Sequence, residues 1–219
     1  MRILIYGINF WPELTGVGKY TGEMAEWLAL RGHEVRVVTA PPYYPEWRVG
    51  HGYCSWHYAG EKLIASSAAG RLHSLVRGQG AALDEEVVTG EAEISVYRCP
   101  LWVPRVQSGA KRILHLMSFV AGSLPVLTRQ LFWKPDVVIG IAPPFFGAPV
   151  ALLAARCCGA RAWLHIQDFE LDAALQLNFL PKWVRGPLEQ VERFVLRRFD
   201  RVSTISPKMQ EKLVMKGVA

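Results

Sequence analysis

Residues 15–19, with the sequence TGVGK, have the clearest chemical potential in this chain. They stand between a short apolar run and an amphipathic segment, which is where a helix should begin. The first backbone N–H groups of a helix have no partner within it, and the helix dipole favours an anion there. Gly16 and Gly18 carry no Cβ atom that would hold a ligand away from these groups. Thr15, Gly16, Val17, Gly18 and Lys19 therefore predict an anion site, although two glycines that only form a turn would give the same pattern.

A second candidate binding segment is rich in aromatic residues and proline and begins with PPYYPEW at positions 41–47. Tyr43, Tyr44 and Trp47 offer rings that can stack on a sugar or on an isoprenoid chain. The same rings could instead cap the edge of a sheet. Both interpretations stay open at this stage.

These segments need elements that position them, and the apolar pattern predicts alternating strands and helices. The expected strands cover 3–6, 35–38, 94–98, 137–141, 162–166 and 201–205, and helices are expected at about 15–31, 108–132, 147–158, 183–199 and from 207 onward. Residues 59–92 are interpreted as a mobile, partly helical insertion. The pattern predicts an α/β fold with a Rossmann-like, doubly wound and mostly parallel sheet. Ligands of such sheets bind beyond the carboxyl ends of the strands.

The first expected helix should bury one apolar stripe against the sheet. The residues of that stripe are Val17, Tyr20, Met24, Trp27 and Leu28, and the opposite side carries Glu23 and Glu26.

Composition narrows the function classes without choosing one. The chain has 219 residues, of which 51% are hydrophobic, so it can bury a core and is not a disordered protein. The net charge of +6 suits nucleic acid, an anionic membrane or a phosphorylated substrate equally. The basic residues are scattered and no nucleic-acid motif appears, so no nucleic-acid partner is expected. Arg2 leads directly into a strand without a signal peptide, so the expected location is cytoplasmic.

Several motifs in order carry a family resemblance. They are FWPELTGVGKYTGEMAEWLALRGHEVRVVTAPPYYPEW, RCPLWVP, IGIAPPFFGAP, LHIQDFELDAA and VSTISPKM. Together they resemble the N-terminal half of a retaining GT-B glycosyltransferase of family 4, and are most similar to colanic acid biosynthesis glycosyltransferases of the WcaI type. The resemblance covers residues 1 to about 58 and about 93 to the end.

The resemblance implies a two-domain enzyme in which the N-terminal Rossmann-like domain holds the acceptor and the C-terminal domain binds the nucleotide-sugar donor. We expect residues 1–219 to be the acceptor-side domain without its donor-binding partner, and so to be inactive alone. The expected reaction transfers a sugar with retention to a glycan or lipid-linked acceptor in exopolysaccharide biosynthesis. No cofactor or metal is expected, because no DxD motif follows a strand.

The resemblance also implies roles for residues. The glycine loop at 15–18 would lie at the donor phosphates, with Lys19 as a further cation or a plain surface lysine. Asp168 would touch the transferred sugar or the acceptor hydroxyl, although an aspartate there also suits a helix N-cap. His165 is the second catalytic candidate, against the more common role of a core histidine. Glu170 is a candidate acceptor contact.

Two alternatives of other kinds remain, together with one possible partner. The domain could bind a sugar or a lipid-linked glycan without transferring it. A nucleotide-dependent oxidoreductase is less favoured, because Thr39 and Ala40 stand where a dinucleotide site has an acidic residue. Residues 110–134 combine apolar bulk with basic flanks, which suits either a core helix or a peripheral contact with the inner face of an anionic membrane, where Trp102, Phe132 and Trp133 would be candidate anchors.

Overall fold

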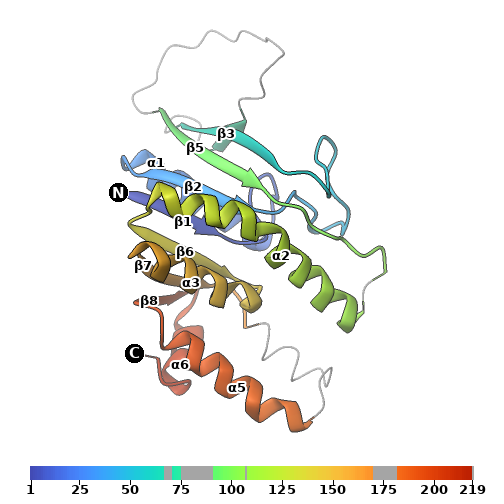
Figure 1. Cartoon of the computed structure of the whole chain (residues 1–219), viewed down its shortest axis with the longest axis vertical. Helices are drawn as coiled ribbons and strands as arrows, with labels where there is room; N and C mark the ends of the chain where they lie inside the picture. The colour runs from blue at the N-terminus through green and yellow to red at the C-terminus, as the bar shows by residue number, and fades with distance from the viewer. Residues whose placement is uncertain (67–70, 75–90, 107, 170–181, 219) are drawn as a thin grey trace.

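The computed structural model has a single sheet with helices on both faces (Figure 1). The structure describes residues 1–66, 71–74, 91–106, 108–169 and 182–218. Within these residues the strands are β1 (Arg2–Tyr6), β2 (Glu34–Thr39), β3 (Ala59–Ser66), β4 (Arg71–Ser74), β5 (Glu91–Arg98), β6 (Val137–Ala142), β7 (Arg161–Ile166) and β8 (Arg201–Thr204). The helices are α1 (Gly16–Leu30), α2 (Gly109–Trp133), α3 (Ala148–Cys158), α5 (Lys182–Leu196) and α6 (Pro207–Met215), with the short 3-10 helix η1 (Phe145–Gly147) before α3.

The strand order is β4-β3-β5-β2-β1-β6-β7-β8. The six strands from β5 to β8 in that order are parallel, whereas β3 runs antiparallel to β5 and β4 antiparallel to β3. The chain winds outward from β1 through β2 and β5, and then resumes on the other side of β1 with β6, β7 and β8. The winding direction thus reverses between β1 and β6, as the predicted doubly wound fold requires.

The central parallel strands β1, β2 and β6 are buried on both faces, as their apolar runs predict. In β1, Ile3 and Ile5 belong to the core under α1, while Leu4 and Tyr6 belong to the core under α2 and α3. The Tyr6 ring stacks on Phe119 of α2 at 5.4 Å between centroids. Alternate side chains of one strand therefore hold helices on opposite sides of the sheet.

The prediction that residues 59–92 are partly helical is wrong for the parts of this segment that the structure describes. Residues 59–66 and 71–74 are strands that extend the sheet beyond β5. Of the described side chains in β3, only Leu63 and Ala65 are buried, so the run has the weak alternation of a strand with one covered face. The strand β3 forms because it pairs with β5, and its own apolar residues are too few to predict that pairing. Residues 67–70 and 75–90 lie outside the described part.

The predicted buried stripe of α1 is confirmed for Val17, Met24 and Leu28, which pack on the core, but is wrong for its aromatic residues and for Glu26. Tyr20 and Trp27 are 51% and 53% exposed, and Glu26 is buried. The buried residues of α1 are Gly18, Thr21, Gly22, Ala25, Glu26, Leu28 and Ala29. Small residues let the helix lie close to the sheet, so its large aromatic residues turn outward. Trp27 is covered there by the Arg31 guanidinium, 3.4 Å from the ring centroid.

Candidate active site

A pocket with a volume of about 190 Å³ lies beyond the carboxyl ends of β1 and β6, where the winding reverses. This is the place where open α/β sheets bind their ligands. Six segments far apart in the sequence supply its walls. They contribute Ile8 and Asn9 after β1, Gly16 and Val17 of α1, Tyr43, Tyr44 and Trp47 after β2, Arg112, His115 and Leu116 of α2, Pro143 and Pro144 after β6, and Asp168 after β7.

The start of α1 borders this pocket with an uncapped helix end. Thr15 takes the N-cap position, but its side chain accepts no hydrogen bond from the helix. Gly16 has φ of 58°, a left-handed conformation that favours glycine. Gly16 is exposed and, with Val17, lines the pocket. Lys19 is not a lining residue, and its ammonium group lies 3.8 Å from Glu23 on the helix surface.

Gly18 has a different role from the one that its position suggests. A Cβ at this position would lie 2.6 Å from both the Cβ and the Oε2 of Glu13, and 3.2 Å from the carbonyl oxygen of Phe10. Gly18 is also buried. Its missing side chain therefore makes room for Glu13, not for a ligand.

Glu13 ties the loop after β1 to the loop after β2. Its Oε1 accepts hydrogen bonds from the backbone N–H groups of Tyr43 and Tyr44, each at 3.0 Å. Its Oε2 accepts one from Asn9 Nδ2 at 2.9 Å. Burial raises the pKa of Glu13, and these three hydrogen bonds and the charge of Arg98 partly oppose the rise. The carboxyl group thus fixes the two loops that form one side of the pocket.

Arg98, the last residue of β5, supports the same loops from beneath. It is 2% exposed and donates hydrogen bonds to the backbone carbonyls of Trp11 and Ala40. Its Nε also donates to Glu61 Oε1 of β3 at 2.7 Å, which pairs the buried charge. Sequence reasoning missed both Glu13 and Arg98. The available signal was one charged residue within an apolar segment, as in FWPEL and YRCP.

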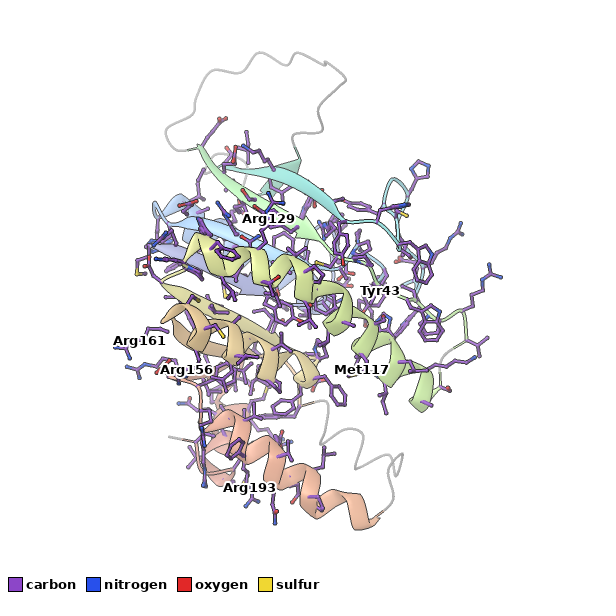
Figure 2. All side chains as sticks on the ribbon, viewed as in Figure 1. Tyr43, Met117, Arg129, Arg156, Arg161 and Arg193 are labelled. Atoms are coloured by element: carbon purple, nitrogen blue, oxygen red, sulfur yellow. The ribbon has the colours of Figure 1, made fainter. Side chains whose placement is uncertain are left out.

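An aromatic cluster forms a further part of the pocket wall. The Tyr43 ring lies 5.6 Å from the Trp47 ring and 4.7 Å from the His115 imidazole, and Trp47 lies 5.2 Å from His115. Figure 2 shows Tyr43, a residue of the loop after β2, beside helix α2. The structure thus brings Tyr43, Tyr44 and Trp47 to one pocket, as their predicted role in ligand binding requires. Sequence reasoning missed His115; its only signal was a polar residue among the apolar residues of α2.

The two predicted catalytic residues are separated. Asp168 is exposed and lines the pocket. His165 is a half-buried residue of β7 whose Nδ1 lies 2.8 Å from Ser203 Oγ, and it is not among the lining residues. Burial lowers the pKa of His165. His165 is therefore a hydrogen-bonded histidine within the sheet. The candidate acceptor contact Glu170 lies outside the described residues.

Gln167, which precedes Asp168, is a further residue that sequence reasoning missed. It is buried, and its Nε2 donates to Thr21 Oγ1 of α1 at 3.3 Å. Gln167 thus links the end of β7 to the first turns of α1. This contact holds the backbone beside Asp168 against the helix that borders the pocket.

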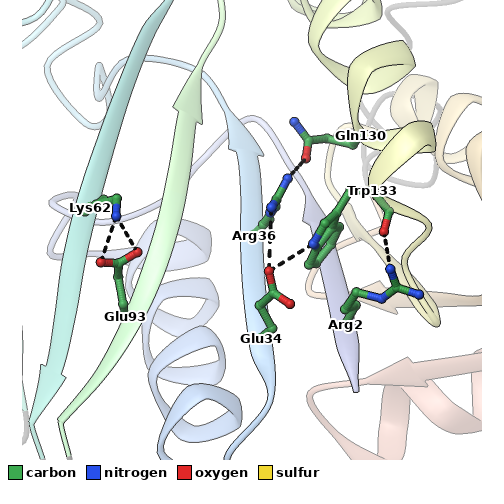
Figure 3. A network of polar contacts seen from close by, with 7 residues as sticks. All are labelled: Arg2, Glu34, Arg36, Lys62, Glu93, Gln130 and Trp133. Carbon is green, nitrogen blue, oxygen red and sulfur yellow. Dashed lines mark hydrogen bonds and ion pairs between the residues drawn. The ribbon is translucent and has the colours of Figure 1, made fainter.

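The opposite, amino-terminal edge of the sheet holds the far end of α2 (Figure 3). Arg2 donates to the carbonyl of Trp133 at 2.6 Å, and the Trp133 indole N–H donates to Glu34 at 2.9 Å. The Arg36 guanidinium lies 4.2 Å from the Trp133 ring centroid and donates to Gln130 at 3.1 Å. Helix α2 is therefore fixed to β1 and β2 at the end remote from the pocket.

Comparison with known proteins identifies the family of this chain. Residues 15–219 match a family described as the glycosyl transferase 4-like domain. The chain belongs to the glycosyl transferase 4-like family. It is 48% identical over 223 residues to a protein of Escherichia coli (strain K12) whose name describes it as a colanic acid biosynthesis glycosyl transferase, WcaI. That alignment covers 100% of this chain and 48% of the relative, so the chain spans about half of the relative's length.

A solved structure shows the same fold for this glycosyl transferase 4-like domain. Sucrose-phosphate synthase from Thermosynechococcus elongatus matches with a TM-score of 0.58 and 12% sequence identity. The match covers 98% of this chain and 45% of that chain. The predicted family and the α/β, Rossmann-like fold of one GT-B half are confirmed. Among the described helices, none has the length and apolar character to cross a membrane.

Proposed function

We propose that this chain is the acceptor-side domain of a retaining glycosyltransferase that acts in the biosynthesis of an exopolysaccharide of the colanic acid kind. The sugar would come from a nucleotide-sugar donor and pass to a glycan or lipid-linked acceptor. The observation that carries the proposal is the pocket at the winding reversal. An uncapped helix end, an aromatic wall and a carboxylate face this one space.

On the donor side, the first N–H groups of α1 stabilise the leaving diphosphate. Gly16 and Val17 line the pocket at this helix end, and the Thr15 side chain does not occupy the N–H groups. Negative charge that builds on the leaving group meets fixed N–H dipoles, which need no rearrangement during the reaction. The nucleotide itself would be held mainly by a second domain.

On the acceptor side, the exposed Tyr44 and the half-buried Trp47 supply the surfaces on which a sugar ring stacks. Tyr43 is only 5% exposed and supports Trp47 by packing against its ring. Asp168 accepts a hydrogen bond from a hydroxyl of the acceptor or of the transferred sugar. Retention follows when the acceptor attacks from the face that the diphosphate leaves, and the leaving phosphate takes the acceptor's proton. Neither a metal nor a covalent carboxylate nucleophile takes part in this proposal, so the domain acts by positioning and by charge stabilisation.

A peripheral contact with the cytoplasmic face of an anionic membrane is supported by the outer side of α2. Leu114, Met117 and Leu124 recur at helical spacing and are between 45% and 60% exposed. Arg129 is exposed on the same helix (Figure 2). Of the candidate anchors, Phe132 is 88% exposed, whereas Trp102 and Trp133 are half-buried.

Co-sedimentation with vesicles tests the membrane contact. The chain should bind vesicles of phosphatidylglycerol more strongly than vesicles of phosphatidylcholine, and Met117→Glu should weaken that binding. Leu153→Glu changes an exposed leucine of α3 and is the matched control. Equal effects of the two substitutions would reject α2 as the contact surface.

Sugar transfer is tested with a chimera in which residues 1–219 precede the second half of the E. coli relative. Labelled sugar is supplied from a panel of nucleotide donors, with membrane extract as the acceptor source. Gly16→Val and Asp168→Ala should each lower the turnover by about 100-fold, the effect of removing one group that stabilises developing charge. Gly109→Ala, at a site with free space around it, is the control. Unchanged turnover in both variants would reject the site, and sugar binding without any transfer would favour a binding module.

A further inference from the structure

We propose that His115 provides a hydrogen-bond acceptor, its Nε2 atom, for a hydroxyl group of the acceptor sugar. This inference rests on the proposed function, since it assumes that a sugar is the ligand of the pocket. It adds to that function a specific residue on α2, and it makes the wall formed by Tyr43, Trp47 and His115 the acceptor subsite.

The tautomer of His115 follows from one contact. Its Nδ1 lies 2.6 Å from the carbonyl oxygen of Trp102. A carbonyl oxygen only accepts, so Nδ1 carries the proton and donates it. A neutral imidazole has a single N–H, which leaves the Nε2 lone pair as an acceptor. The ring is held in this orientation because the N–H of Trp102 also donates to Ser118 Oγ of α2, at 3.0 Å.

Among the described residues, the Nε2 atom of His115 has no hydrogen-bond partner. The His115 side chain is fully buried, and Nε2 is among the few buried polar atoms without a hydrogen bond in the described structure. Buried polar atoms are nearly always paired, because an unpaired one loses its bonds to water without replacement. An unpaired acceptor on a residue that lines a pocket points to a ligand that donates a hydrogen bond.

The charge state of His115 agrees with an acceptor role. Burial lowers its pKa, and the nearby charge of Arg112 acts in the same direction, although the hydrogen bond to Trp102 opposes both. The other groups that face this region are the Tyr43 and Trp47 rings and, in the same pocket, Asp168. The imidazole therefore stays neutral near neutral pH and keeps its lone pair.

The Trp47 ring lies beside the buried His115 imidazole, at 5.2 Å between ring centroids, and lines the same pocket. Its φ of 52° lies in the left-handed region, which a bulky residue rarely adopts. In this proposal a sugar that reaches the buried Nε2 displaces the adjacent half-buried Trp47 ring, which can then stack on the sugar.

The surrounding chemistry suits a hydroxyl-rich ring linked to phosphate. Aromatic faces contact the apolar side of a pyranose, while His115 and Asp168 are two acceptors for its hydroxyl groups. Arg112 precedes His115 by nearly one helical turn and lines the same pocket, where it favours an anionic group. Sugar 1-phosphates therefore serve as probes beside methyl glycosides and inorganic phosphate.

Two substitutions of His115 separate the acceptor role from a structural one. His115→Asn keeps a donor near the position of Nδ1, for the Trp102 carbonyl, and removes the acceptor. His115→Gln loses that donor and places an amide oxygen near the position of Nε2. The affinity of the 219-residue chain is measured by ligand-observed NMR for methyl glucoside, galactoside, mannoside and fucoside and for their 1-phosphates. His115→Asn should weaken sugar binding by about tenfold, and His115→Gln should retain more of it.

A mutant cycle identifies the hydroxyl. One monodeoxy analogue of the best glycoside should bind the wild type about tenfold more weakly than the parent sugar, and should bind His115→Asn as well as the parent does. Unchanged affinity in His115→Asn would overturn the inference. So would equal losses in both proteins for every deoxy analogue. Binding of inorganic phosphate alone, with no sugar contribution, would also overturn it.

The transfer assay distinguishes this inference from the proposed function. If the chimera transfers sugar and His115→Asn leaves the acceptor KM unchanged, only the inference fails. If the chimera transfers nothing but sugar binding depends on His115, only the proposed transfer fails. The ¹⁵N spectrum of His115 checks the premise, because a proton on Nε2 at neutral pH would contradict the assigned tautomer.

Discussion

A Cβ atom on Gly18 would lie 2.6 Å from the Cβ of Glu13. The first turn of α1 therefore rests directly on the residue whose carboxyl group holds the backbone of Tyr43 and Tyr44. Because these contacts are continuous, the helix end and the aromatic loop on either side of the pocket keep one fixed separation.

Gly18→Ala should destabilise the fold although alanine is the better helix former. The propensity gain is about 1 kcal/mol, whereas the clash is with a buried side chain and with the Phe10 carbonyl and should cost about 1–3 kcal/mol. Urea unfolding measures the difference. Gly109→Ala at the start of α2 meets nothing within 4 Å and should be neutral or slightly stabilising. Equal stability of the two variants would contradict the predicted clash.

Substitutions of Glu13 should separate its hydrogen bonds from its charge. Glu13→Gln keeps an oxygen for the N–H groups of Tyr43 and Tyr44, and should cost about 1 kcal/mol through the contact with Asn9. Glu13→Ala leaves three donors without their acceptor and should cost about 2–4 kcal/mol. The unfolding midpoints of the two variants in urea provide the measurement, and a larger loss for glutamine than for alanine would refute this account.

The stability of the fold should fall in mild acid because of His115. Burial holds its pKa below the ordinary 6.5, so the unfolded chain takes up a proton at a pH where the folded chain does not. The contribution is complete above about pH 6.5 and is lost as the pH falls toward the folded pKa, by at most about 1.4 kcal/mol per pH unit.

Urea unfolding at pH 7.5 and 5.5 measures this slope for the wild type and for His115→Asn. The variant should lose less stability between the two pH values, because its amide does not titrate. His165, whose pKa is also lowered by burial, remains in both proteins and cancels in the comparison. Identical losses would show that His115 does not carry the effect.

Cys54 should be the first thiol to react with iodoacetamide. It is exposed, and hydrogen bonding from the Trp56 backbone lowers its pKa, with a further contribution from His57, whose Nδ1 lies 3.1 Å from the sulfur. Cys99 should react slowly, since burial raises its pKa to about 12. Mass spectrometry over a time course gives the order. His57→Ala should slow the labelling of Cys54 alone, and an unchanged rate would exclude this histidine as a cause.

The sequence was sufficient for features that depend on neighbouring residues. The apolar run at Ile3–Tyr6 locates the first strand, and the glycine at position 16 locates the start of the next helix. Both signals are carried by residues that are neighbours in the sequence. The resemblance added Asp168, and the aromatic content of the loop after β2 added Tyr43 and Trp47. Gly16, Tyr43, Trp47 and Asp168 all line one pocket.

The roles of the other site residues could not be predicted, because they depend on contacts with residues far away in the sequence. Glu13 is explained by backbone groups thirty residues away, and Arg98 by Trp11 and Ala40. In the sequence, His115 is only a polar residue within an apolar helix. Its role depends on the Trp102 carbonyl and on the loop after β2, which contact it only in the folded structure. Trp27 is the opposite case: its size and helical spacing predicted burial, but it is exposed, because most of the α1 residues that face the sheet are small.

Helix α2 connects the pocket to the opposite edge of the sheet. A Cβ on Gly122 would lie 2.6 Å from the carbonyl oxygen of Pro100, so the middle of the helix packs closely against the backbone of Pro100. Eleven residues after Gly122, Trp133 is hydrogen-bonded to Arg2 of β1 and Glu34 of β2. Seven residues before Gly122, His115 is hydrogen-bonded to the carbonyl of Trp102. At about 1.5 Å per residue, His115 and Trp133 are roughly 27 Å apart along the axis. One continuous helix therefore reaches from the pocket to the opposite edge of the sheet, and contacts at its middle and at both ends set the position of His115.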